Sequence, residues 1–218
     1  MRIIAVALIV VSLAACDETQ PAPVPTSAPA PAQADTRGVI LFIGTSLTAG
    51  YGVGAEYAYP ALIQAKLDSA GLPYRVVNAG ISGETSAGGL RRIDWALQQP
   101  TEVLVLELGA NDGLRGLDPD SMKRNLEALI RRTREKYPTA EIVIAGMQAP
   151  PNLGAQYTHR FHAVYGDLAD KFDAVLIPFL LEGVAARPEL NQSDGIHPTV
   201  EGQRVIAETV WMHLKPVL

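Results

Sequence analysis

The sequence lacks several features that would point to other classes of protein. Its single cysteine, Cys16, excludes a disulfide within the chain. The formal net charge is -5, and the basic residues are scattered except for a cluster at residues 131–136. We interpret that cluster as the solvated face of a helix, so the sequence offers no basic surface for nucleic acid. The apolar run at residues 3–11 is also shorter than the roughly twenty residues that a membrane-spanning helix needs.

The N-terminus has the pattern of an export signal. Arg2 precedes the short apolar run, which is typical of a secretory signal peptide. Leu13-Ala14-Ala15-Cys16 then resembles the bacterial lipobox, in which the signal is cut before a lipidated cysteine. We therefore expect residues 1–15 to be a signal peptide and Cys16 to carry a lipid on the periplasmic face of a bacterial membrane. In the alternative, an ordinary signal peptide is cut at a small residue, Cys16 has no role, and the protein is soluble in the periplasm.

The next segment has a composition that cannot build a core. Residues 16–37 carry the lipidated cysteine and then closely spaced prolines among alanine, serine and threonine, which predicts an extended tether. The remaining residues, 38–218, number about 180 and are enough for one domain with a sizeable core.

Short apolar segments alternate with helical periodicity throughout that domain. We expect strands at residues 38–43, 74–78, 103–108, 141–145 and 174–177, and helices at 60–70, 89–98, 119–136, 157–171 and 200–214. This alternation predicts an α/β architecture around a mainly parallel sheet. Ligands in such sheets bind beyond the carboxyl ends of the strands, where Ser46 and two Gly-rich loops at 78–80 and 109–112 fall.

Three residues compose a candidate nucleophilic site. Ser46 follows the first expected strand, and Asp194 and His197 lie three positions apart just before the last helix. A serine alcohol attacks at neutral pH only if an imidazole takes its proton, and a carboxylate must orient that imidazole. Asp194 and His197 can share one tight turn, so the fold has only to bring Ser46 to them. The combination predicts a serine hydrolase.

Other interpretations of these residues fit less well. The Gly-x-Ser-x-Gly elbow of α/β-hydrolases requires glycine where this chain has Thr48. A zinc site needs three or four protein ligands, and the remaining histidines lie on helical segments that supply no obvious cluster. We expect no metal and no organic cofactor.

Acyl transfer also needs donors for the carbonyl oxygen as it becomes negatively charged. The candidates are the backbone N–H of Ser46, the unobstructed N–H of Gly83 and the side-chain amide of Asn111. Taken singly, Gly83 and Asn111 would be ordinary turn residues. We interpret them as an oxyanion hole because they occur together with Ser46, Asp194 and His197.

Four segments resemble, in order, the sequence blocks of the SGNH (GDSL) hydrolase family. They are Gly44-Thr45-Ser46-Leu47, the Gly83 loop, Gly109-Ala110-Asn111-Asp112 and Asp194-Gly195-Ile196-His197-Pro198. The stretch after Asn111 is most similar to the bacterial periplasmic thioesterase, lysophospholipase and arylesterase type. The resemblance implies a flavodoxin-like three-layer α/β/α fold with a five-stranded parallel sheet. It also implies that Ser46 is the nucleophile, His197 the general base and then acid, and Asp194 its orienting partner, with Ser46, Gly83 and Asn111 as the oxyanion hole.

One residue departs from that family pattern. The family usually has aspartate before the nucleophile, whereas this chain has Thr45. That carboxylate has none of the three catalytic roles. We therefore expect an active enzyme whose nucleophile loop is held by different hydrogen bonds.

The resemblance favours lysophospholipids, aryl or short-to-medium acyl esters and acyl thioesters as substrates. We expect the protein to be a monomer. Residues 113–117 and 147–154 follow strand ends and could either wall an acyl groove or be plain connections. Two alternatives stay open. One is a carbohydrate O-acetylesterase of the cell envelope, and the other is a non-catalytic lipoprotein that binds lipid or glycan.

Overall fold

The computed structural model describes residues 35–218, in which a compact unit runs from Thr36 to Leu218. The expected signal peptide, Cys16 and the tether up to residue 34 lie outside the described residues. A five-stranded sheet forms the centre of the unit, in the order β2-β1-β3-β4-β5, and all neighbouring strands are parallel. The strands are β1 (Gly38–Gly44), β2 (Tyr74–Gly80), β3 (Val103–Glu107), β4 (Glu141–Ala145) and β5 (Val175–Ile177).

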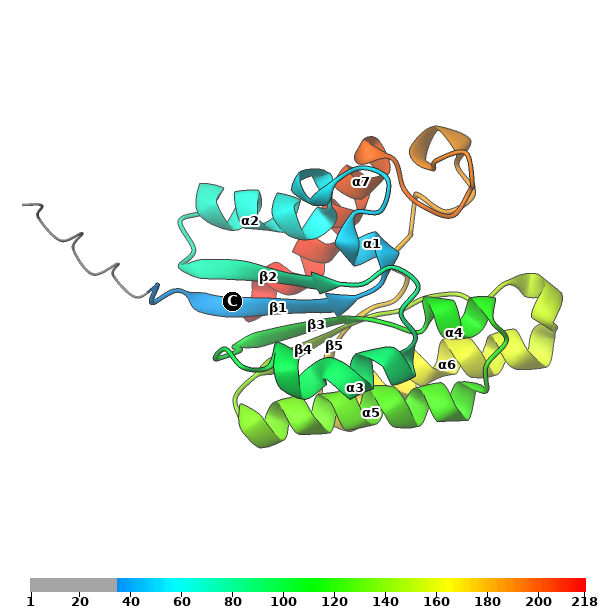
Figure 1. Cartoon of the computed structure of the whole chain (residues 1–218), viewed down its shortest axis with the longest axis horizontal. Helices are drawn as coiled ribbons and strands as arrows, with labels where there is room; N and C mark the ends of the chain where they lie inside the picture. Colours follow the sequence, from blue (N-terminus) through cyan, green and yellow to red (C-terminus); the bar gives the residue numbers. More distant parts are fainter. Residues whose placement is uncertain (1–34) are drawn as a thin grey trace, which may run out of the picture. The chain divides into compact units, whose positions relative to one another are not determined.

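Helices cover both faces of this sheet (Figure 1). One face carries α1 (Ser46–Ala49), α2 (Tyr59–Ser69) and α7 (Val200–Leu214). The other carries α3 (Ser86–Ala96), α4 (Ala110–Leu114), α5 (Pro119–Lys136) and α6 (Ala155–Phe172). Single 3₁₀ turns occur at Ala55–Tyr57, Pro151–Leu153, Pro188–Leu190 and Lys215–Val217. The expected three-layer α/β/α fold is confirmed, and its strand order is the flavodoxin-like one.

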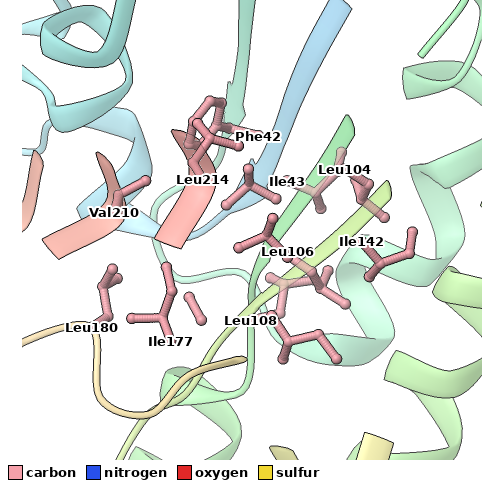
Figure 2. Close-up of a cluster of buried hydrophobic side chains, with 14 of the residues drawn as sticks. Phe42, Ile43, Leu104, Leu106, Leu108, Ile142, Ile177, Leu180, Val210 and Leu214 are labelled. Carbon is pink, nitrogen blue, oxygen red and sulfur yellow. The ribbon is translucent and has the colours of Figure 1, made fainter. Parts of the chain in front are cut away.

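The central strands are apolar because both of their faces are covered. Every residue of β3 is buried, as is every residue of β1 after Gly38. Figure 2 shows Phe42 and Ile43 of β1 in one cluster with Val210 and Leu214 of α7 and with residues of β3 and β4. The last helix is therefore an integral part of the core, although it is far from β1 in sequence.

Two short helices, α1 and α4, follow the ends of β1 and β3. The segment that contains Ser46 forms α1, which ends at Gly50 in the left-handed conformation. The segment at residues 109–112 enters α4 through Gly109, whose φ is 112°. A Cβ at Gly109 would lie 2.3 Å from the Tyr165 hydroxyl, so this turn admits only glycine.

The strand register brings three loops to one edge. Gly44 at the end of β1 pairs with Gly80 at the end of β2 and with Glu107 at the end of β3. The loops that follow these strands therefore start at the same level, as the sequence predicted.

Within residues 35–218, no helix has both the length and the apolar character needed to cross a membrane.

Candidate active site

Ser46 lies at the first turn of α1, directly after the central strand β1. Thr45 caps this helix with its side-chain oxygen, and Ser46 begins the helix. The Ser46 Oγ lies 3.0 Å from His197 Nε2, across 151 positions of sequence. The fold thus brings the predicted alcohol and imidazole within direct proton-transfer distance.

His197 and Asp194 share one tight turn, as their spacing predicted. Asp194 Oδ1 accepts the backbone N–H groups of Ile196 and His197 at 2.9 and 3.0 Å. Its Oδ2 lies 2.7 Å from His197 Nδ1. Gly195 completes the turn with a φ of 69°. Asp194 therefore orients the ring through hydrogen bonds within the turn that the two residues share.

Those hydrogen bonds also fix the charge of Asp194. The His197 backbone N–H, then the His197 ring and the Ile196 N–H, hold the pKa of this carboxyl well below its usual range. Asp194 is accordingly ionised at neutral pH. An ionised partner selects the tautomer in which His197 Nδ1 donates to Asp194, which leaves the Nε2 lone pair to accept the Ser46 hydroxyl.

Two contacts that the sequence analysis did not foresee support the histidine. The ring of Tyr51 lies against the His197 ring with their centroids 4.5 Å apart. Gln192 donates from Nε2 to the Tyr51 carbonyl at 2.8 Å, and its backbone N–H donates to the His197 carbonyl at 2.7 Å. The loop after α1 is thereby attached to the histidine loop. No periodic pattern marks Tyr51, because its contact with residue 197 exists only in the folded chain.

Gly83 and Asn111 face the same cavity as Ser46 and His197. Gly83 has a φ of 76°, and its carbonyl accepts a hydrogen bond from Arg115 Nη2 at 2.9 Å. Asn111, on α4, donates from Nδ2 to the Glu84 carbonyl at 3.0 Å. This bond attaches the amide of Asn111 to the loop that carries Gly83.

The Gly83 loop is itself held from both sides. Glu84 forms a mostly buried ion pair with Arg92, which also donates to the Ala79 carbonyl at 2.6 Å. Ser86, at the start of α3, donates from its N–H and its hydroxyl to Asp112 at 2.8 and 2.6 Å. The two predicted oxyanion donors, Gly83 and Asn111, thus belong to one hydrogen-bonded unit.

An apolar cavity of about 690 Å³ opens beside these polar groups. Both segments that the sequence analysis considered as groove walls contribute, through Leu114 and through Met147 to Pro151. The segment after β5 adds Phe179 and Leu181, which the sequence analysis did not foresee. The cavity is large enough for an acyl chain with several methylene groups.

The other polar residues of the described chain do not form a metal site. Among residues 35–218, no three histidine, cysteine, aspartate or glutamate side chains gather in a way that could hold an ion.

Comparison with known proteins identifies the class to which this fold and site belong. The model of the GDSL-like lipase/acylhydrolase family matches residues 42–205, and the chain belongs to this family of ester hydrolases. It is 42% identical to esterase TesA of Pseudomonas aeruginosa over 82% of this chain and 89% of the relative. It is 41% identical to thioesterase 1/protease 1/lysophospholipase L1 of Escherichia coli K12, over 86% of each chain.

Solved structures give the same result for the fold. A crystal structure of TesA matches with a TM-score of 0.78 at 42% identity, over 83% of this chain and 99% of that one. The esterase EstA from Pseudoalteromonas sp., solved with monoethylphosphonate as inhibitor, matches with a TM-score of 0.77 at 34% identity, over 82% and 97% of the two chains.

Proposed function

We propose that the protein hydrolyses carboxylic esters through an acyl-enzyme on Ser46. The observation that carries this proposal is the connected series Asp194 to His197 to Ser46, with 2.7 Å and 3.0 Å between successive polar atoms. This order of carboxylate, imidazole and alcohol is the arrangement that activates a serine. The phosphonate inhibition of EstA, to which the chain is similar, supports the same chemistry.

Acylation is the first of two steps. Ser46 Oγ attacks the acyl carbon while His197 Nε2 takes the serine proton. The N–H groups of Ser46 and Gly83 and the amide of Asn111 then stabilise the oxyanion, and each such donor contributes about 3 kcal/mol. The bond to the leaving group breaks as His197 returns the proton to the departing alcohol or thiol.

Deacylation repeats these steps with water. His197 takes a proton from a water molecule, whose oxygen attacks the acyl carbon of the acyl-enzyme. The carboxylic acid leaves as the proton passes back to Ser46 Oγ. Asp194 stays ionised throughout and stabilises the imidazolium formed in each step. None of these steps calls on a metal or an organic cofactor.

The substrates that we propose are lysophospholipids, aryl esters and short-to-medium acyl esters, with acyl thioesters as a further class. The apolar side chains of Leu114, Met147, Phe179 and Leu181 around the cavity support a hydrocarbon acyl group. The names of the relatives, an esterase and a thioesterase/lysophospholipase, agree with this range.

The proposed location follows from the N-terminal sequence. The protein is exported and held at the periplasmic face of a bacterial membrane by a lipid on Cys16, as a monomer. Arg2, the apolar run and Leu13-Ala14-Ala15-Cys16 support this location. A soluble periplasmic form is the alternative.

The test of the proposed function is covalent labelling combined with a series of p-nitrophenyl esters from acetate to decanoate. A fluorophosphonate probe should label the wild type, and Ser46→Ala should abolish labelling and lower kcat at least about a thousandfold. Ser69→Ala is the matched control, because Ser69 lies on α2 and its hydroxyl donates to the Ala65 carbonyl at 2.7 Å.

Each other outcome of this experiment counts against the proposal. A wild type that neither labels nor turns over any ester would be a binding lipoprotein. A sharp preference for acetate, with loss of rate on longer chains, would favour the O-acetylesterase. Full activity in Ser46→Ala would remove Ser46 from the mechanism.

A further inference from the structure

Glu107 is a fully buried carboxyl group to which the mechanism above gives no role. It ends β3, has no exposed surface and pairs in register with Gly44 at the end of β1. Gly44 is followed by Thr45 and then Ser46. The carboxyl group therefore lies directly beneath the turn that presents the nucleophile.

Three hydrogen-bond donors from that turn converge on this one carboxyl group. The backbone N–H of Thr45 donates to Oε2 at 2.7 Å, and the Thr45 hydroxyl lies 2.9 and 3.0 Å from the two carboxyl oxygens. The Thr48 hydroxyl donates to Oε2 at 2.8 Å and is itself bonded to the Tyr59 hydroxyl at 2.7 Å. All three donors reach Oε2, and the Thr45 hydroxyl lies between the two carboxyl oxygens.

The space around this carboxyl group is filled. A Cβ at Gly44 would lie 2.7 Å from Glu107 Oε2 and 2.0 Å from the Thr48 hydroxyl oxygen. Glycine at position 44 therefore lets Glu107 and Thr48 meet beneath the nucleophile turn. Thr45 and Thr48 are 1% and 0% exposed, so water does not compete for these bonds.

Thr45 connects the carboxylate to the start of α1. Its hydroxyl hydrogen points to Glu107, and its oxygen accepts the N–H of Leu47 at 3.5 Å. Thr45 thus joins Glu107 to Leu47, the residue that follows Ser46. An aspartate at this position would bring a second carboxyl group to within about 3 Å of Glu107, and one of the two would have to carry a proton.

We propose that Glu107 is a positioning residue for Ser46, acting through Thr45 to hold the turn that sets Ser46 Oγ at hydrogen-bond distance from His197. The inference rests on the proposed function, because it assumes that Ser46 is the nucleophile. Glu107 does not line the cavity and so acts through the turn alone. Loss of the Thr45 bond is therefore expected to lower kcat and to leave KM nearly unchanged.

The test compares Thr45→Val, Thr45→Ser and the wild type at pH 8 on p-nitrophenyl butyrate. Valine has the shape of threonine without the hydroxyl, and serine retains the hydroxyl. We expect Thr45→Val to lower kcat about tenfold, since a misplacement of about 1 Å costs up to a hundredfold, with KM within about twofold of the wild type. The rate of fluorophosphonate labelling should fall in parallel with kcat, and Thr45→Ser should restore both to near the wild-type values.

The control is Thr133→Val on α5, where the lost hydroxyl is also fully buried and bonds the Leu129 carbonyl far from the site. Thr133→Val is expected to melt at a lower temperature with an unchanged kcat. If Thr45→Val also loses only thermal stability and keeps kcat, the role is structural and the inference is wrong. If the wild-type protein is not labelled at Ser46 at all, the proposed function fails first, and the two failures are thereby distinguished.

Discussion

Two carboxyl groups of this site show how burial decides the state of an ionisable residue. Asp194 is partly exposed and accepts hydrogen bonds from its own turn, which lowers its pKa. Glu107 is fully buried, and loss of solvent raises its pKa from 4.5 to about 7 despite the donors from Thr45 and Thr48. Asp194 is therefore charged at neutral pH, whereas Glu107 changes charge near pH 7.

The raised pKa of Glu107 predicts how stability depends on pH. The folded state holds a proton on Glu107 up to about pH 7, whereas the unfolded chain releases it near pH 4.5. The contribution to stability is therefore fully present below pH 4.5 and is lost as the pH rises through about 7. The full loss is on the order of 3 kcal/mol. Urea unfolding between pH 4.5 and 8, for the wild type and Glu107→Gln, measures it.

The comparison of the wild type with Glu107→Gln isolates the titration of Glu107, because all other titrating residues are common to both proteins. Tyr59 and Tyr165 sense the charge of Glu107, but their own pKa values are raised well above 10 by burial, so they stay neutral in this range. The wild type should lose stability relative to Glu107→Gln as the pH rises. A difference between the two proteins that stays constant with pH would contradict the prediction.

At the scale of residues, the sequence predicted the members of the site that residue type alone identifies. Ser46, Asp194 and His197 are a recognisable set of residue types, and the local turn of Asp194 and His197 follows from their spacing. The sequence marks Glu107 only weakly, as a charged residue at the end of an otherwise apolar strand. Its role depends on two threonines from another strand's loop, and that contact is a property of the fold.

At the scale of elements, the first turn of α7 supports the loop that carries Asp194 and His197. Gly202 lies against this loop, and a Cβ at its position would be 2.3 Å from the Leu190 carbonyl oxygen and 2.9 Å from Pro198. The Thr199 N–H donates to the same carbonyl at 2.9 Å. The helix start and the loop thus fit together without spare space.

Substitution of two helical glycines by alanine tests this fit. Gly202→Ala should lower the free energy of unfolding by about 1–3 kcal/mol and also lower kcat, because the loop has to shift. Gly166→Ala on α6 is the matched control, since its added Cβ meets nothing within 4 Å. It should raise the free energy of unfolding by about 0.5–1 kcal/mol with no change in kcat. Denaturant unfolding and esterase assays measure both variants.

The opposite ranking of these two variants would show that the contact with Leu190 does not hold the loop. Equal effects would show that helix propensity alone governs both positions.

Elements with strong end signals were predicted best. The helix α5 begins at Pro119, behind Asp118, which accepts the Ser121 N–H at 3.1 Å, and its predicted bounds match the structure, as do those of α7. The bounds of the short helix α1 were not predicted, and α4 was predicted only as a Gly-rich loop. Helices of 4 and 5 residues are too short to show a 3.6-residue period, and they form because the neighbouring loops pack around them.

At the scale of the whole molecule, we propose that the N-terminal segment sets where the catalytic domain is found in the cell. If Cys16 is lipidated, wild-type protein should sediment with membranes, and Cys16→Ser should appear in the soluble fraction. Turnover of a soluble ester should be equal in the two, because Cys16 precedes the catalytic domain. Cell fractionation and the mass of the N-terminal peptide measure these outcomes. Wild-type protein that is soluble, with an unmodified cysteine, would instead support an ordinary signal peptide.

The position of α7 in the core has a consequence for biosynthesis. A ribosome makes Ser46 well before His197, and the helix that holds the histidine loop in place, α7, is made after both. Under the proposed mechanism, the serine of a nascent chain is an inert alcohol until His197 and α7 have emerged. The proposed hydrolysis therefore requires both halves of the domain, and a chain that stops short of His197 should be inactive.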